Sequence, residues 1–323
     1  MALPSATFTE MVTTTLRDHR KELADNVSKN NALLAILTKK GNVEMADGGY
    51  EIAEPLDYQE NSTYTRYSGY DTLNVQSSDV LTSAKYDWKQ ATVAVTCNGR
   101  ELRSNSGKAA MIKLAKARLD NAMRSAKNGL SSDVYSDGTT ANQINGLQAL
   151  VSNAGTGTVG GIDSSAQTWW KSGVQSAASP IQGGGGITPS ATTIQSLMLP
   201  LWLQLSRGTD MPDTIVSSND YFTFYESSLV ANQRYMDADE ATGGFLTLRY
   251  KSAKVIFDGG SGIPTASMYF LNTDFLKLVV HSAANWTRVD DKSSVNQDAV
   301  VMPLIWQGNL VCRNRALQGI VKA

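Results

Sequence analysis

Two segments with the side-chain alternation of β-strands flank a long polar stretch, and this arrangement limits the folds open to the chain. One is GGYEIAEPLDYQENS (48–62) and the other is SAKYDWKQATVAVTC (83–97). The intervening segment (63–82) is rich in tyrosine and has no apolar run able to bury it. Because a two-stranded ribbon is marginally stable in water by itself, the sequence predicts an extended hairpin loop, 49–92, that needs other surfaces for its stability.

The composition is that of a globular protein with no strong overall charge. The chain has 323 residues, of which 41% are hydrophobic and 18% charged, and its formal net charge is −1. No overall field therefore draws it to nucleic acid or to an anionic membrane, and any such contact is local. Neither a membrane span nor a secretory signal is visible. Cys97 and Cys312 are expected to be buried thiols.

The segment before the hairpin has an interrupted helical pattern. Apolar residues recur at steps of three and four between positions 7 and 38, and Gly41 ends the pattern. The apolar stripe is thin, because polar residues such as His19 and Asn30 occupy positions where a core helix carries aliphatic side chains. We expect residues 1–48 to form an N-terminal arm that lies along another surface.

The clearest helix follows the second strand, at 106–132. Its stripe of small and apolar residues, from Met111 through Leu119 to Leu130, permits close packing on a sheet or helix. Its other faces carry a basic set: Lys108, Lys113, Lys116, Arg118, Arg124 and Lys127. Such a set is either a solvated surface or a contact for an anionic partner, which is nucleic acid or the acidic surface of another protein.

The remaining segments predict an α+β fold. Residues 93–187 hold the basic helix and a Gly- and Ser-rich region, 188–287 alternate helix and strand patterns, and 288–323 are strand-like and are expected to return to the earlier domain. Gln307-Gly308 marks an expected turn in that last part. GTGTVG (155–160) has the spacing of a dinucleotide loop, but no helical pattern follows it, so the match is rejected.

Catalytic constellations are missing from the sequence. His19 and His281 have no metal-ligand spacing around them, and the acidic groups at 237–240 and 290–291 do not follow a known calcium loop. The tryptophans at 169, 170 and 202 are expected to pack rather than to stack on a ligand. We therefore predict no enzyme activity, no catalytic residue, no cofactor and no metal.

Several stretches, in order, resemble the major capsid (coat) proteins of tailed bacteriophages. They are YSGYDTL, YDWKQATVAVT, GLSSDVYSDGT with INGLQALV, RGTDMPDTIVSS before YFTFYE, and GNLVCRNRALQGI, and the likeness covers nearly the whole chain. The resemblance implies an N-terminal arm, an extended β-hairpin loop, a peripheral domain with a long spine helix, an axial domain at 188–287, and a return to the peripheral domain.

The same resemblance implies the function. It predicts a structural protein that self-assembles into hexamers and pentamers of an icosahedral head, in the cytoplasm of a bacterial host, around double-stranded DNA contacted without sequence specificity. It also implies a separate scaffolding protein, a portal and a cement or decoration protein as partners, and no membrane. Two alternatives share some of these features: an encapsulin-like compartment shell and a phage tail or fibre protein.

The charges of the hairpin suggest how copies dock. The hairpin is acidic and the helix at 106–132 is basic, so opposite charges on neighbouring copies set register more than affinity. The predicted inter-subunit contact residues are Glu51, Glu54, Asp57, Glu60, Arg66, Tyr67 and Tyr70. The basic residues of the helix are predicted to face either a neighbouring copy or DNA in the lumen.

Overall fold

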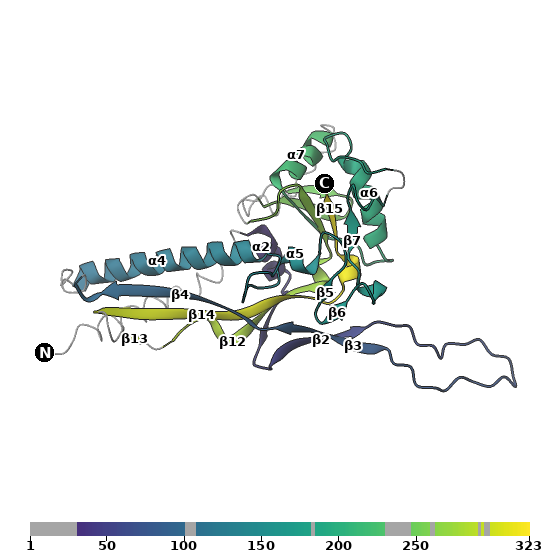
Figure 1. Ribbon diagram of the computed structural model, residues 1–323, viewed down its shortest axis with the longest axis horizontal. Helices are drawn as coiled ribbons and strands as arrows, with labels where there is room; N and C mark the ends of the chain where they lie inside the picture. The colour runs from purple at the N-terminus through teal and green to yellow at the C-terminus, as the bar shows by residue number, and fades with distance from the viewer. Residues whose placement is uncertain are drawn as a thin grey trace.

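The computed structural model comprises two lobes and a projecting hairpin (Figure 1). It describes residues 31–100, 108–181, 185–229, 247–258, 262–289, 292–293 and 298–323, with the side chains of 108–117, 247 and 292–293 excepted. Most of the predicted N-terminal arm, 1–30, lies outside these residues. The shape is elongated, with one long lobe, one compact lobe, and the hairpin extending away from both.

The elongated lobe is a helix lying along a five-stranded sheet. Helix α4 (Lys108–Asp133) packs along β4, and the strand order is β1-β12-β14-β13. Strand β4 pairs with the edge of β14 opposite to β12 and β13. The strands are β1 (Val43–Ala46), β4 (Lys89–Asn98), β12 (Leu276–Arg288), β13 (Lys292–Ser293) and β14 (Ala299–Cys312). The predicted helix at 106–132 is thus confirmed within the described range. Its stripe is buried from Leu119 to Leu130, as the spacing of small and apolar residues requires.

Residues 31–46 are built into this lobe. Asn31 caps helix α2 (Ala32–Lys39) by accepting a hydrogen bond from the Leu34 N–H at 3.0 Å. Leu33 and Leu37 are fully buried. After Gly41, which takes a φ of +77°, β1 pairs in parallel with β12. This part of the predicted arm therefore belongs to the core of its own chain.

The compact lobe is a six-stranded sheet with two helices on one face. The order is β7-β15-β11-β8-β10-β9, and helix α6 (Ile194–Leu205) covers β7 and β15 while α7 (Asn219–Ser228) covers β8 and β10. The strands are β7 (Gly173–Gln175), β8 (Thr214–Ser217), β9 (Thr247–Tyr250), β10 (Ala253–Phe257), β11 (Ser267–Leu271) and β15 (Gly319–Lys322). A second apolar core lies between these helices and the sheet.

The lobes do not follow the sequence boundaries predicted for the domains. Strand β12 belongs to the elongated lobe although it falls mostly within 188–287, and β7 belongs to the compact lobe although it falls within 93–187. The prediction that 288–323 returns wholly to the first domain is wrong for β15, which pairs with β7 and β11 in the compact lobe. Gln307-Gly308 is no turn, since β14 runs continuously through it.

The hairpin consists of β2 (Glu51–Asp57) and β3 (Leu81–Asp87), paired antiparallel from Glu51–Asp87 to Asp57–Leu81. Its predicted end at 92 is too late, because β4 begins at Lys89 and pairs with β14 in the long sheet. Trp88 separates β3 from β4, whereas the sequence pattern predicts one continuous strand across both. Shorter elements lie near the hairpin and the lobe boundary: α5 (Leu147–Leu150), β5 (Thr158–Val159), β6 (Ile162–Asp163), and 3-10 turns at Thr168–Trp170, Thr273–Phe275 and Arg315–Leu317.

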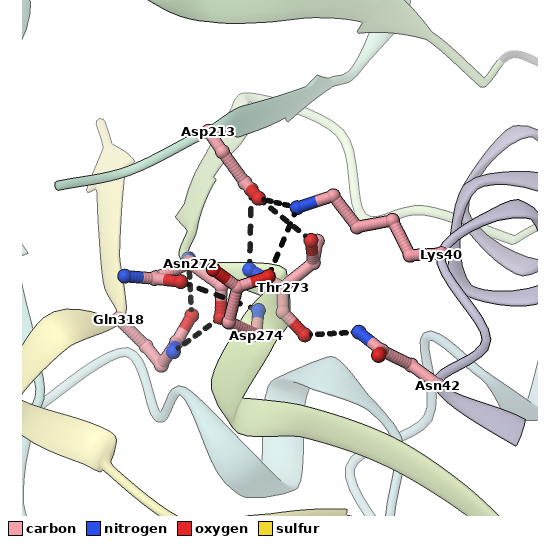
Figure 2. A network of polar contacts seen from close by, with 7 residues as sticks. All are labelled: Lys40, Asn42, Asp213, Asn272, Thr273, Asp274 and Gln318. Carbon is pink, nitrogen blue, oxygen red and sulfur yellow. Dashed lines mark hydrogen bonds and ion pairs between the residues drawn. The ribbon is translucent and has the colours of Figure 1, made fainter. Parts of the chain in front are cut away.

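A polar network joins the two lobes where β11 leads into β12 (Figure 2). The Lys40 ammonium lies between the carboxylates of Asp213 and Asp274. The backbone N–H of Thr273 donates to Asp213 at 3.1 Å, and the Thr273 hydroxyl donates to it at 2.8 Å. Asn42 donates to the Thr273 carbonyl at 2.5 Å.

The charges of this network are balanced against burial. Burial lowers the pKa of Lys40, but the hydrogen bond and charge of Asp213, followed by those of Asp274, outweigh it and raise that pKa. On the far side of the network, the Gln318 side chain accepts from the Asn272 N–H at 2.9 Å and donates to the Asn272 carbonyl at 3.0 Å. The network thus ties β1, β8, β12 and β15 together.

Candidate assembly interface

The hairpin leaves the body from a firmly bonded root, which we define as β2, β3 and the residues that they contact. The Lys85 N–H donates to the Gly160 carbonyl at 2.9 Å, and the Asn309 side chain donates to the Asp87 carbonyl at 2.8 Å. The Tyr86 hydroxyl donates to the Cys312 carbonyl at 2.8 Å. Burial raises the pKa of Tyr86, so its hydroxyl stays protonated and remains a donor.

The root also has an apolar face, contrary to the expectation of a ribbon with no core of its own. Ile52, Leu56, Ala84 and Tyr86 are buried and belong to the same apolar cluster as the long sheet. Gly160, at a φ of +60°, lies so close that a Cβ there would stand 2.8 Å from the Ala84 Cβ. Only glycine allows this approach. The root is therefore part of the monomer's fold.

Glu54 belongs to the root, and this corrects its predicted role. Its side chain is 6% exposed and its carboxylate accepts from the Arg313 Nε at 2.5 Å. The prediction that Glu54 docks on a neighbouring copy is wrong, because its charge is buried against its own chain. Glu51 also has a partner in its own chain, since Lys85 Nζ lies 2.6 Å from its carboxylate across the hairpin.

The hairpin tip, residues 58–80, is the opposite of the root. It has no helix or strand, and Figure 1 shows it reaching into open space beyond β2 and β3. Tyr64 is 81% exposed and Tyr70 is fully exposed. Other exposed side chains in or beside the tip are Asp57, Glu60, Arg66, Tyr67, Leu73 and Val75. Exposed large apolar side chains gathered in one segment are typical of surfaces that contact another protein.

A cavity of about 440 Å³ marks the point where the tip leaves the root. Tyr58, Leu81 and Trp169 contribute to its lining, and the Tyr58 and Trp169 ring centroids lie 5.6 Å apart. Leu81 is largely exposed beside them. The tip is thus supported at its base by aromatic packing, while farther out it has hydrogen bonds within itself, such as the one from the Asn74 side chain to the Ser62 carbonyl at 3.4 Å.

The basic set of α4 divides into residues with different surroundings. Arg118 donates to the Thr96 carbonyl of β4, so it is bound to its own sheet. Arg124 is exposed and donates to the Asp120 carbonyl one turn earlier, at 3.3 Å, while Lys127 is half-buried. Lys108, Lys113 and Lys116 lie in α4, but their side chains fall outside the described residues. Which partner this face contacts stays a prediction.

The described residues offer little for catalysis. They contain no group of three or more His, Cys, Asp and Glu side chains that could hold a metal ion. The His281 ring packs edge-on against Trp88, with centroids 5.5 Å apart. Trp170 and Trp202 are buried in the fold, which confirms the prediction that they pack. GTGTVG leads into the β5–β6 hairpin and not into a helix, as predicted.

Two further observations concern the cysteines and the search for a membrane-spanning helix. Cys97 and Cys312 are buried thiols, as predicted, and burial raises the pKa of the Cys312 thiol to about 12. Within the described part of the chain, no helix is both long and apolar enough to span a membrane.

Comparison with solved structures shows which fold this is. The chain is similar to one in a cyanophage A-1(L) capsid asymmetric unit, with a TM-score of 0.60, 15% identity, and coverage of 88% of this chain and 91% of that one. It is similar to a capsid chain of an empty GTA particle, with a TM-score of 0.55, 10% identity and 88% of both chains covered. A chain of Mycobacterium phage Ogopogo gives 0.52, 8% identity, and coverage of 89% and 91%.

These likenesses, at 15% identity and below, establish a shared fold. The α+β architecture is that of tailed-phage capsid proteins. No protein-family model matches the sequence, and no curated protein matches it either.

The sequence did not predict the contacts that hold the root on the body. The residues that hold it, including Gly160, Asn309 and Arg313, are far from the hairpin in sequence. One signal was available, because Ile52, Glu54 and Leu56 alternate onto one face of β2 and two of the three are apolar. That pattern places Glu54 on the buried face.

Proposed function

We propose that this chain is the major capsid protein of a tailed bacteriophage, and that it self-assembles into hexamers and pentamers of an icosahedral head enclosing double-stranded DNA. The observation that carries the proposal is the capsid fold, shared over 88% of the chain with the cyanophage capsid chain. The partners proposed with it are a separate scaffolding protein, a portal and a cement or decoration protein. The virion is then its final location.

The contrast between root and tip supports an assembly role. Two aromatic side chains of the kind exposed on the tip bury roughly 300 to 500 Å² when they are covered. Permanent assemblies bury about 2,000 Å² or more in total. The tip therefore supplies a substantial part of an interface to a neighbouring copy, while the root keeps it at a fixed angle to its own body.

The charges of the hairpin set its position on the neighbouring copy. From 57 to 80 the hairpin carries four acidic residues, Asp57, Glu60, Asp71 and Asp79, against one base, Arg66. The exposed face of α4, with Arg124, is a matching surface on a neighbour. Exposed pairs contribute only about 0 to 1 kcal/mol each, so these charges select the position while the tyrosines supply most of the affinity.

The alternative use of the basic face of α4 is contact with packaged DNA. Phosphate contacts from Arg124 and Lys127 would hold DNA without reading its sequence, which suits a container. DNA binding of this kind weakens steeply with salt. Measuring DNA retention of shells from Arg124→Gln and Lys127→Gln variants at rising salt separates the two uses, since a neighbour contact affects shell yield instead.

The function is tested by expressing the chain alone and with a candidate scaffolding protein, followed by electron microscopy. Closed icosahedral particles that contain DNA in infected cells support the proposal. Particles that enclose folded protein cargo and never DNA would instead indicate a compartment shell. A chain that forms neither rings nor shells under any of these conditions would contradict it.

A further inference from the structure

A second cavity, of about 400 Å³, lies on the flank of the compact lobe. Its walls come from β7 at the edge of the six-stranded sheet, from the end of α6, and from the turn at 315–317. The lining includes Lys171, Ser172 and Arg207. None of the described lining residues is acidic, so among them the cavity has two cations and no carboxylate to balance them.

Three polar side chains of this cavity, those of Lys171, Arg207 and Ser172, have no ion-pair or hydrogen-bond partner in the described part of the chain. The Lys171 ammonium and the Arg207 guanidinium are exposed and form no ion pair there. Ser172 is only 3% exposed, yet its hydroxyl has no hydrogen-bond partner. A buried hydroxyl without a partner is destabilising, and a ligand that accepts its hydrogen bond removes this cost. Donors and cations of this kind fit an anion.

The position of the cavity indicates where the anion comes from. In Figure 1, α6 and β7 lie on the side of the compact lobe toward which the hairpin projects, whereas α7 lies on the other side. A neighbour that covers the hairpin tip must therefore approach this flank. The helix whose end contributes to the cavity wall, α6, also exposes Leu203 (62%) and, one turn earlier, Leu199 (42%). An apolar pair next to unpaired cations is typical of a protein interface, in which polar groups surround an apolar centre.

In the ring of the proposed function, a neighbouring copy can present a carboxylate at this place. Identical copies around an axis use two different surfaces, so the β7 flank of one copy faces the opposite flank of the next. On that opposite flank the first turn of α7 carries Asp220, which is exposed.

We propose that the cavity at Lys171, Arg207 and Ser172 binds a carboxylate presented by a neighbouring copy of this chain. The inference rests on the proposed function, because it requires copies to stand side by side in a ring. Lys171 and Arg207 pair with the carboxylate, the Ser172 hydroxyl donates to it, and Leu199 and Leu203 pack against the apolar surface around it. The contact is separate from the hairpin and lies in the compact lobe.

The direct test is a zero-length cross-link in particles assembled from equal amounts of ¹⁴N- and ¹⁵N-labelled chain. A carbodiimide condenses an ammonium with a carboxylate in contact, releasing water to the reagent and forming an amide. We expect peptides in which Lys171 of one copy is joined to an Asp or Glu of a differently labelled copy. Lys171 found only unmodified, or joined only within one copy, would overturn the inference.

Charge reversal gives the functional test. The double variant Lys171→Glu, Arg207→Glu should lower the fraction of chain in rings and shells at least tenfold, with an unchanged urea midpoint for the isolated chain. The matched control is Lys39→Glu, since Lys39 is also an exposed lysine without an ion pair among the described residues. Equal assembly of the double variant and the control would contradict the proposal.

Two other outcomes distinguish related explanations. If wild-type chain binds inorganic phosphate in calorimetry and the double variant does not, while both assemble equally, the anion is not a neighbour's carboxylate and the inference fails alone. If wild-type chain stays monomeric under all assembly conditions, the proposed function fails, and this inference fails with it.

Discussion

The root and the tip of the hairpin belong to one ribbon but have opposite surroundings. The root has buried side chains on one face, hydrogen bonds to Gly160, Cys312 and Asn309, and a glycine that admits it closely. The tip, 58–80, exposes tyrosines and carries a net negative charge. The root therefore contributes to the stability of the single chain, whereas the tip contributes to the contact between chains. Substitutions in the two regions should separate these effects.

The largest effect is expected at the tip and should appear only in assembly. Replacing Tyr64, Tyr67 and Tyr70 with Ser removes aromatic burial of about 1.5 kcal/mol or more per side chain. The sum, above about 4 kcal/mol, corresponds to roughly a thousandfold loss in association. Shell yield is measured by sedimentation, and stability of the isolated chain by urea unfolding, which should change by less than about 0.5 kcal/mol.

Tyr50→Ser is the matched control for this triple variant, because Tyr50 is almost fully exposed but precedes the root. We expect its effect on shell yield to be much smaller. A triple variant that assembles like wild type would show that the tip makes no contact between copies.

The next effect is expected at the root and should appear in the isolated chain. In Gly160→Ala the new Cβ meets the Ala84 Cβ at 2.8 Å and the Tyr86 ring at 3.2 Å, at a φ of +60°. Overpacking and the left-handed backbone together should cost about 2 to 4 kcal/mol. Gly161→Ala separates the two causes, because its φ of +75° is similar but no atom lies within 4 Å of its Cβ. If both variants unfold at the same urea concentration, the contact of the Gly160 position with Ala84 and Tyr86 adds nothing to the cost of the left-handed backbone.

A smaller effect is expected from the ion pair of the root. Glu54→Ala leaves Arg313, 36% exposed, without its buried partner. Removing one member of a fully buried pair costs about 3 to 5 kcal/mol, and partial exposure of Arg313 reduces this to about 1 to 3 kcal/mol. Glu51→Ala is the control, since the Glu51–Lys85 pair is more exposed. Equal losses of unfolding free energy in the two variants would remove the distinction between a buried and an exposed pair.

The smallest effect is a pH dependence at an exposed pair. The hydrogen bond from Lys277 lowers the pKa of Glu44 from its ordinary value of 4.5, with burial opposing and the charge of Lys277 adding to the shift. Because the folded state binds the proton less tightly, this contribution is present above pH 4.5 and is lost as the pH falls below it. Glu44→Gln should therefore flatten the acid limb of stability slightly between pH 5 and roughly pH 3. An unchanged slope would show that the pair is fully screened.

The helices and strands were predictable where the pattern of apolar side chains repeats regularly. The pairing of the strands with one another was not predictable. The stripe of α4 from Leu119 to Leu130 repeats at helical spacing, and the alternation of β2 and β3 identifies the hairpin. Strand pairing depends on contacts far apart in sequence, so the assignment of β12, β7 and β15 to lobes was wrong. Gly308 is an example, since a Cβ there would meet the Val279 carbonyl at 2.6 Å, and the glycine serves close packing within β14 instead of a turn.

In the candidate site too, some features could be predicted from the sequence and others could not. The exposure of Tyr67 and Tyr70 follows from a polar segment with no apolar run to bury it. The burial of Glu54 depends on Arg313, a partner 259 positions away, and no local pattern identifies such a partner. The cavity at Lys171 and Arg207 likewise forms only when β7 and the end of α6 meet.

The central claim is that the tip lies on a neighbouring copy while the root stays on its own chain. A reconstruction by electron cryomicroscopy of particles assembled from the purified protein tests it most directly. The account predicts closed shells in which density for 58–80 runs across the adjacent copy and residues 51–57 keep their contacts with Gly160 and Arg313. Monodisperse single copies at high concentration, or shells in which 58–80 folds back on its own lobe, would contradict it.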